Sequence, residues 1–274
     1  MQLHCGAFKI DLTCPKVMGI VNVTPDSFSD GGRYDSFSSA IDHAHQLIAD
    51  GADMLDIGGE STRPGAAEVG EQEELDRVLP VIEGLRGINV PISIDTWKPA
   101  VMRAALRAGA TMVNDVNALQ AEGAIPAVAA TGAAVCLMHK QGTPQSMQQR
   151  PDYDDVVREV SDFLQQRIAA AVAAGIGQER IVIDPGFGFG KTLAHNIALL
   201  RELDSFSALA VPVLAGMSRK SMLGAITGRD VSDRLAASVA AAMLAVQRGA
   251  SIVRVHDVRE TVDALKILNA LNEG

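Results

Sequence analysis

The sequence has few aromatic residues and few cysteines: Phe, Trp and Tyr make up 4% of its 274 residues, and there are three cysteines. Cys5, Cys14 and Cys136 are an odd number and lack the spacing of a metal site, so neither a disulfide framework nor a zinc site is predicted. This pattern fits a reducing cytosol, with Cys136 as a small core residue on a strand.

Long apolar runs and basic clusters are also missing. No apolar stretch is long enough to span a bilayer, and the N-terminus lacks the basic region and apolar segment of a signal peptide. The formal net charge is −9 and the basic residues are scattered, which argues against a nucleic-acid or anionic-membrane surface. We therefore expect a cytoplasmic protein without a nucleic-acid or membrane partner.

Strand-like and helix-like patterns alternate along the chain, and no linker rich in Pro, Ser or Gly divides it. The predicted strands are residues 17–23, 54–59, 91–96, 111–116, 133–139, 180–186, 211–218 and 251–257. The predicted helices include residues 38–51, 73–87, 98–109, 156–175, 232–249 and 258–272. Several helices end in a glycine placed as a C-cap, namely Gly51, Gly87, Gly109, Gly175 and Gly249.

This alternation predicts a parallel sheet, and the near-continuous apolar strands predict burial on both faces. Eight such units favour an α/β fold of the (β/α)8 TIM-barrel type, with a doubly wound open sheet as the alternative. We expect a single domain over residues 1–274, in which the segment 2–12 forms a short β-hairpin that caps the barrel floor.

Polar residues recur where the predicted strands end. These ends are Asn22, Asp56, Asp95, Asn114 with Asp115, Met138 with His139, Asp184, Ser218 with Arg219 and Lys220, and Arg254 with His256. The carboxyl ends of barrel strands meet at one mouth, where active sites lie. A single Asp could simply cap a helix, but a complete set of polar ends predicts a site. The acidic and amide groups suit a ring edge rich in N–H donors, and Lys220, Arg254 and His256 suit a phosphate group beside it.

Two long loops follow the first two predicted strands. They read NVTPDSFSDGG at 22–32 and ESTRPGAAEVG at 60–70. Long Gly- and Pro-rich loops at one mouth are typical of lids that become ordered when substrate binds.

Together these motifs resemble the dihydropteroate synthase family. The resemblance rests on NVTPDSFSDGG (22–32), DIGGESTRPG (56–65), SIDT (93–96), VNDV (113–116), MH (138–139), DPGFGFGK (184–191), GMSRK (216–220) and RVHD (254–257), in the right order along the whole chain. It implies a TIM barrel, a homodimer, and a Mg²⁺-dependent transferase of folate biosynthesis. Such an enzyme joins 6-hydroxymethyl-7,8-dihydropterin diphosphate to p-aminobenzoate and releases pyrophosphate.

The resemblance also implies the roles of individual residues. The pterin would contact Asp56, Asp95, Asn114, Met138, Asp184, Phe189, Gly216 and Lys220. The p-aminobenzoate would contact Phe28, Thr62, Arg63, Pro64, Lys220 and Ser221. The diphosphate would contact Asn22, Thr62, Arg63, Arg254 and His256, with Asn22 as the Mg²⁺ ligand. The catalytic set would be Asp95, Asp184, Lys220, Arg254 and His256, and the unaltered loop residues imply sensitivity to sulfonamides.

Other functions compete with this one. A folate-dependent methyltransferase would share the pterin-facing Asp and Asn residues but would need neither SFSDGG, nor STRPG, nor RVH. A pterin-binding barrel without catalysis would carry a damaged motif, and none is found.

Three further patterns are interpreted as lacking the chemistry that they resemble. GFGFGKT (186–192) resembles a phosphate-binding loop, but Pro185 stands where the first Gly is needed. DSFSDGG resembles a calcium loop but lacks its closing Glu. His43 and His45 lie two apart on a helix, cannot face one metal, and are expected on the surface.

The Ala-rich segment 236–245 is expected at a subunit interface.

Overall fold

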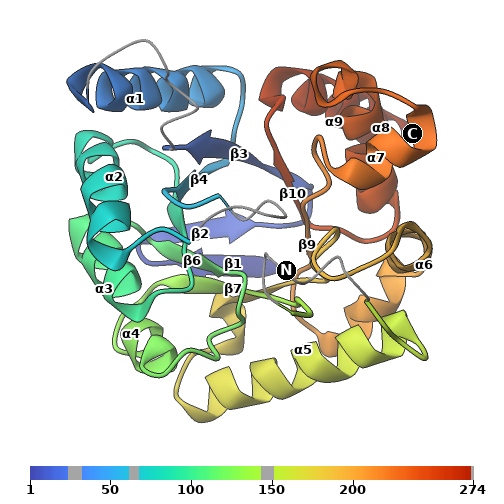
Figure 1. The fold of residues 1–274 in the computed structure, drawn as a ribbon, viewed down its shortest axis with the longest axis horizontal. Helices are drawn as coiled ribbons and strands as arrows, with labels where there is room; N and C mark the ends of the chain where they lie inside the picture. Colours follow the sequence, from blue (N-terminus) through green and yellow to red (C-terminus); the bar gives the residue numbers. More distant parts are fainter. Residues whose placement is uncertain (24–32, 62–67, 143–150, 273–274) are drawn as a thin grey trace.

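A ring of parallel strands forms the centre of the molecule (Figure 1). The computed structural model describes residues 1–23, 33–61, 68–142 and 151–272. The eight-stranded sheet has the order β8-β7-β6-β5-β4-β3-β10-β9, and a bridge between Ile183 and Val213 joins its two ends. Its strands are β3 (Lys16–Asn22), β4 (Met54–Gly58), β5 (Ile92–Asp95), β6 (Met112–Asp115), β7 (Ala134–Met138), β8 (Ile181–Asp184), β9 (Leu214–Ala215) and β10 (Ile252–Val255). The predicted (β/α)8 barrel is confirmed, and the open sheet is excluded.

Helices surround this ring (Figure 1). They are α1 (Arg33–Ala49), α2 (Glu71–Gly84), α3 (Pro99–Ala108), α4 (Ala124–Ala129), α5 (Val156–Ala173), α6 (Leu193–Arg201), α7 (Ser221–Thr227), α8 (Leu235–Gln247) and α9 (Val258–Asn272), with short 3-10 turns η2 (Gln178–Arg180), η3 (Leu203–Leu209) and η4 (Val231–Asp233). The five glycines predicted to end helices all have positive φ, between 86° and 134°. This left-handed conformation is the one that glycine adopts at least cost, so the predicted C-caps are confirmed.

An antiparallel hairpin closes the lower end of the barrel, as predicted; the lower end is the one at which the parallel strands begin, and the upper end is the one at which they finish. The hairpin consists of β1 (Gln2–Cys5) and β2 (Phe8–Asp11). Leu3 and Cys5 are fully buried and pack against a cluster of inward-facing strand residues: Met18, Met54, Met112, Ala134, Cys136, Val182, Leu214 and Ile252. The prediction that Cys136 is a core residue is confirmed.

The strands are apolar on both faces because each face has its own core. Met54 and Met112 belong to the cluster inside the barrel, whereas their neighbours Leu55 and Val113 belong to the cluster between barrel and helices. Since successive side chains of a strand point to opposite faces, a strand buried on both sides must be apolar throughout. Within the described residues, no helix is long and apolar enough to cross a membrane.

Candidate active site

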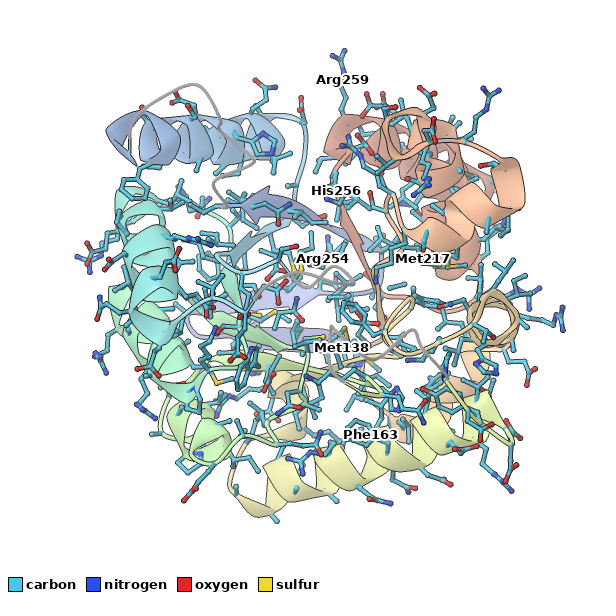
Figure 2. The ribbon with its side chains drawn as sticks, in the orientation of Figure 1. Met138, Phe163, Met217, Arg254, His256 and Arg259 are labelled. Atoms are coloured by element: carbon cyan, nitrogen blue, oxygen red, sulfur yellow. The ribbon has the colours of Figure 1, made fainter. Side chains whose placement is uncertain are left out.

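The inward faces of the strands change from apolar to polar one pleat above the floor cluster. Met54 is followed on the same face by Asp56, Met112 by Asn114, Val182 by Asp184, and Ile252 by Arg254, whereas on β7 Cys136 is followed by the apolar Met138. The same two-residue period that fills the barrel with apolar atoms therefore brings the polar groups to its upper end. Figure 2 shows Met138 and Arg254 within the ring, whereas Arg259 points out from the molecule.

Arg254 connects three strands through its guanidinium group. Its Nε donates to Oδ2 of Asp56 at 2.5 Å, and its Nη2 donates to Oδ2 of Asp95 at 2.7 Å. The side-chain amide of Asn114 donates to the same Asp56 oxygen at 2.9 Å. Asp56 is fully buried, and its Oδ1 has no hydrogen-bond partner among the described residues. An unpaired buried carboxylate oxygen is costly, so it is a candidate acceptor for a ligand.

Burial dominates the acid–base properties of this cluster. It raises the pKa of Asp95 to about 7, although the charge of Arg254 acts in the opposite direction. Burial also raises the pKa of Asp184, against the charge of Lys220. It lowers the pKa of Lys220 to about 8, against the attraction of Asp184. Burial opposes the charge of Arg254 too, but Asp56 and Asp95 outweigh it and raise its pKa. Shifted pairs of this kind are common where chemistry takes place.

A second group of side chains surrounds the segment after β8. Oδ1 of Asp184 accepts a hydrogen bond from the Gly186 N–H at 2.7 Å. The amine of Lys220 lies 4.5 Å from the centre of the Phe189 ring and donates to the carbonyl of Phe187. A Cβ on Gly216 would lie 3.8 Å from Oδ2 of Asp184, so Gly216 borders this carboxylate directly.

The remaining predicted residues lie at the ends of β3 and β10 and at the start of α7. His256 is half-buried, and its Nδ1 lies 3.0 Å from Oγ of Ser218. Asn22 ends β3 beside Gly58, and Ser221 is the exposed first residue of α7. Phe28, Thr62, Arg63 and Pro64 lie outside the described residues. The two surface histidines, His43 and His45, are exposed as expected.

Two buried lysines beside the site were missed by the sequence interpretation. Lys98, two residues beyond the SIDT motif, contacts Glu60 and Glu74. Lys191 belongs to the motif GFGFGKT (186–192) that resembled a phosphate loop. A signal for the first existed: Glu74 has the helical spacing of Val78 and Val81, which places an acid on the buried face of α2.

The arrangement suits a ligand with two parts. Buried carboxylates and an amide can accept from and donate to a polar ring, and Lys220, Arg254 and His256 can attract an anion. The described residues hold no group of three His, Cys, Asp or Glu side chains that could bind a metal by themselves.

Comparison with known proteins identifies close relatives. Residues 18–256 match the family described as pterin binding enzyme. The dihydropteroate synthase of Escherichia coli K12 is 50% identical, with 98% of this chain and 96% of the relative aligned. That of Neisseria meningitidis serogroup C is 54% identical over the same shares. Among solved structures, Yersinia pestis dihydropteroate synthase in a sulfonamide complex has a TM-score of 0.95 at 50% identity, covering 100% of both chains. The Xanthomonas albilineans enzyme with 4-aminobenzoic acid has a TM-score of 0.94 at 54% identity, covering 99% and 98%.

Proposed function

Because the chain belongs to the pterin-binding enzymes, and within them to the dihydropteroate synthases, which are transferases, we propose that its reaction takes place at the Asp56–Asp95–Arg254 cluster. The enzyme joins 6-hydroxymethyl-7,8-dihydropterin diphosphate to p-aminobenzoate and forms 7,8-dihydropteroate and pyrophosphate. Structures of the Xanthomonas albilineans relative with 4-aminobenzoic acid and with 7,8-dihydropteroate support these substrates and this product. The observation that carries the site is the convergence of buried carboxylates and one guanidinium at the strand ends.

The pterin is proposed to bind against the inward-facing side chains of β4 to β8. Its ring nitrogens and amino group would meet Asp56, Asp95, Asn114 and Asp184, which supply the acceptors that N–H donors need. The free Oδ1 of Asp56 supports this placement. The walls of the pocket would be Met138, Phe189, Gly216 and the Lys220 stem.

The diphosphate is proposed to lie beside the last two strands. Lys220 and Arg254 provide positive charge, and these two residues together with His256 provide the N–H donors that a departing pyrophosphate requires. Within the described residues, Nη1 of Arg254 has no hydrogen-bond partner, since Nε and Nη2 serve the two aspartates. One edge of the guanidinium can therefore keep the carboxylates in place while Nη1 contacts the anion.

We propose a dissociative substitution. The bond between the methylene carbon and the diphosphate oxygen breaks first, and the electron pair leaves with pyrophosphate. The carboxylates of Asp95 and Asp184 stabilise the positive charge left on the methylene. The amine of p-aminobenzoate then forms the C–N bond and loses a proton. An aryl amine is a weak base, so positioning contributes more than a general base, and we assign none. A secondary isotope effect near unity at the methylene would contradict this order of steps.

Mg²⁺ is the proposed cofactor. This ion is typically held by one or two protein oxygens together with substrate phosphates, so it needs no cluster of three acidic residues. The amide oxygen of Asn22 and Oδ2 of Asp95 flank Gly58, at 4.0 Å and 3.8 Å from the position of a Cβ there, and oxygen donors fit Mg²⁺. Asn22 and the diphosphate would hold the ion, which would supply charge neutralisation for the leaving group.

The p-aminobenzoate is proposed to bind near Lys220 and Ser221, together with Phe28, Thr62, Arg63 and Pro64 from outside the described residues. Since the Yersinia pestis relative was solved with a sulfonamide drug, we expect sulfonamides to compete at this subsite. Thr62 and Arg63 are also proposed to contact the diphosphate.

The proposed assembly is a homodimer in the cytoplasm, with the whole chain acting as one domain. Ala241, Ala242 and Ala245 of α8 are buried within the chain, whereas Leu235 and Leu244 are 42% and 49% exposed. Exposed leucines on one helix support an interface there. Light scattering on wild type and on Leu244→Glu tests it, with loss of the dimer expected only for the variant.

Pyrophosphate release tests the reaction. We expect release from the pterin diphosphate only when both Mg²⁺ and p-aminobenzoate are present, together with dihydropteroate. Asp95→Asn and Arg254→Ala should lower kcat by at least about 100-fold, because each removes a charge that acts in the transition state. The control is Lys9→Met, an exposed residue of β2 on the floor hairpin. Tight pterin binding without release would instead identify a non-catalytic pterin-binding barrel.

A further inference from the structure

The amine of Lys191 lies inside the glycine-rich loop that joins β8 to α6. The residue is 2% exposed. Its Nζ donates to the carbonyl oxygens of Gly186 at 2.9 Å and Phe189 at 3.1 Å. It also lies 3.0 Å from Nδ1 of His139 and 3.4 Å from the carbonyl oxygen of the same residue. These contacts occupy the amine completely, so it is not available to a phosphate as the similarity to a phosphate loop would require.

The sequence of this loop gives it little intrinsic preference for one backbone conformation. Gly186, Gly188 and Gly190 all have positive φ, and glycine gives up more backbone entropy than any other residue when it is ordered. A Cβ on Gly186 would lie 1.8 Å from the carbonyl oxygen of His139, so the chain passes there too closely for any other residue. The conformation must therefore be imposed by contacts with the rest of the protein.

Side chains from α6 and from the segment before α5 add to the contacts of Lys191. Oδ1 of Asn196 accepts from the Gly188 N–H at 2.7 Å, and its amide donates to the carbonyl of Thr192 at 2.7 Å. The hydroxyl of Tyr153 donates to the carbonyl of Gly190 at 2.9 Å. Lys191 differs from these residues because it holds the two carbonyls, at 186 and 189, that bracket Phe187 and Gly188.

The hydrogen bonds of Lys191 are complete in both protonation states. Burial lowers the pKa of Lys191 to about 7, with Asp184 opposing this and Lys220 adding to it, and burial lowers that of His139 to about 3. A lysine ammonium has three N–H donors, which suffice for the carbonyls of Gly186 and Phe189 and for Nδ1 of His139. A neutral amine donates to the two carbonyls and accepts from the Nδ1–H tautomer of His139. The His139 ring is in turn packed edge-on against Phe163 of α5, at 4.9 Å between centroids.

The other side of this loop borders the pterin site. Lys220 contacts the ring of Phe189 and the carbonyl of Phe187, and a Cβ on Gly188 would lie 3.3 Å from Cδ of Lys220. The loop thus bonds to two lysine amines, one in the proposed site and one in the interior. A shift of residues 186–189 would move both Phe189 and Lys220.

We propose that Lys191 is a positioning residue of the pterin site, which holds the backbone of residues 186–189 so that Phe189 and Lys220 face the ring. This rests on the proposed function, since it assumes that the pterin binds against Phe189. Lys191 touches neither substrate and acts only through the loop.

Lys191→Met tests the proposal. We expect the KM for the pterin diphosphate, and the Kd for 6-hydroxymethylpterin in a fluorescence titration, to rise about 10-fold or more, since the loop loses its hydrogen bonds. The KM for p-aminobenzoate should rise less than that for the pterin diphosphate, because its subsite shares Lys220 with the pterin site but not Phe189. If Lys191→Met does not fold, Lys191→Gln, which keeps a polar group, is measured in its place.

Two controls separate positioning from lost stability. Lys9→Met makes the same chemical change at an exposed site and should match wild type. Leu85→Ala removes a fully buried side chain after α2 and should lower Tm without raising the pterin Kd. Pterin binding that weakens equally in Leu85→Ala, or equal rises in both KM values, would overturn the proposal.

Asp184→Asn distinguishes the two levels of failure. If it weakens pterin binding while Lys191→Met does not, only the positioning role is wrong. If Asp184→Asn binds pterin like wild type, the proposed pterin site is wrong, and the proposed role of Lys191, which depends on it, is wrong too.

Discussion

Lys98 and Lys191 are both buried lysines in segments that join a barrel strand to the next helix, but they have opposite surroundings. The amine of Lys98 contacts two carboxylates, of Glu60 at 2.6 Å and Glu74 at 2.5 Å. The amine of Lys191 contacts three backbone carbonyls and an imidazole. Burial lowers the pKa of both, yet the carboxylates reverse the shift for Lys98, whose pKa is raised, whereas that of Lys191 falls to about 7.

The comparison shows that burial alone does not decide the charge of a lysine; the charge of its acceptors does. Each arrangement also serves a different segment. Glu60 accepts a hydrogen bond from the Val69 N–H at 3.1 Å as well as from Lys98. The carboxylate therefore connects residue 69 to residue 60 and to Lys98. Lys191 instead stabilises the loop between β8 and α6, by donating to uncharged backbone carbonyls of that loop.

Removing the charged partner should have the largest effect on stability. Lys98→Met leaves the carboxylates of Glu74, fully buried, and Glu60 without their cation, which costs about 3–5 kcal/mol in the free energy of unfolding. Urea denaturation at pH 7 measures it. A loss below about 1 kcal/mol would mean that the two carboxylates relax to water, and the contrast between the lysines would disappear.

The pH dependence of Lys191→Met should be the next largest effect. Because the folded-state pKa of Lys191 is about 7, the unfolded chain binds more protons from there up to about pH 10, and wild-type stability rises with pH in that window. The stability difference between wild type and variant should therefore grow by up to about 1.4 kcal/mol per pH unit between pH 7 and 9.

Lys98→Met provides the contrast in the same experiment. The pKa of Lys98 is raised, so its contribution is fully present below the ordinary lysine pKa and is lost only as pH rises through the higher folded-state value. Its stability difference should be flat between pH 7 and 9. A similar slope for both variants would contradict the assignment of opposite shifts.

Lys266→Met should have the smallest effect. This lysine of α9 is 73% exposed and pairs with Asp263 one helical turn away, at 3.8 Å. Exposed pairs contribute little, so the change in unfolding free energy should lie within about 0.5 kcal/mol. A larger loss would contradict the description of this pair as solvent-exposed and weakly stabilising.

Much of the barrel and the inner set of polar side chains could be predicted from the sequence because both follow the period of a strand. Met54 and Asp56, or Ile252 and Arg254, are two residues apart on short apolar runs, and the position of each polar group follows from the strand itself. The order of the motifs along the chain then indicated the family.

The support behind the site could not be predicted in the same way. Lys98, Glu60 and Glu74 come from three segments, and their contact depends on how α2 packs against the barrel. Lys191 belongs to a motif whose letters suggested phosphate binding, and only the path of the loop shows that its amine turns inward. The pairing of Arg254 with Asp56 and Asp95 was equally hidden, since charge alone does not choose among several carboxylates.

The closure of the ring by β10 has a consequence for how the protein is made. Arg254 lies 198 residues beyond Asp56 and 159 beyond Asp95 in the chain, and β10 must pair with β3 at the opposite end of the sequence. Contacts of such high sequence separation form late, and folding that depends on them is slow. During synthesis, the earlier strands emerge with their carboxylates unpaired, and the enzyme acquires its site only after residues 252–256 have left the ribosome.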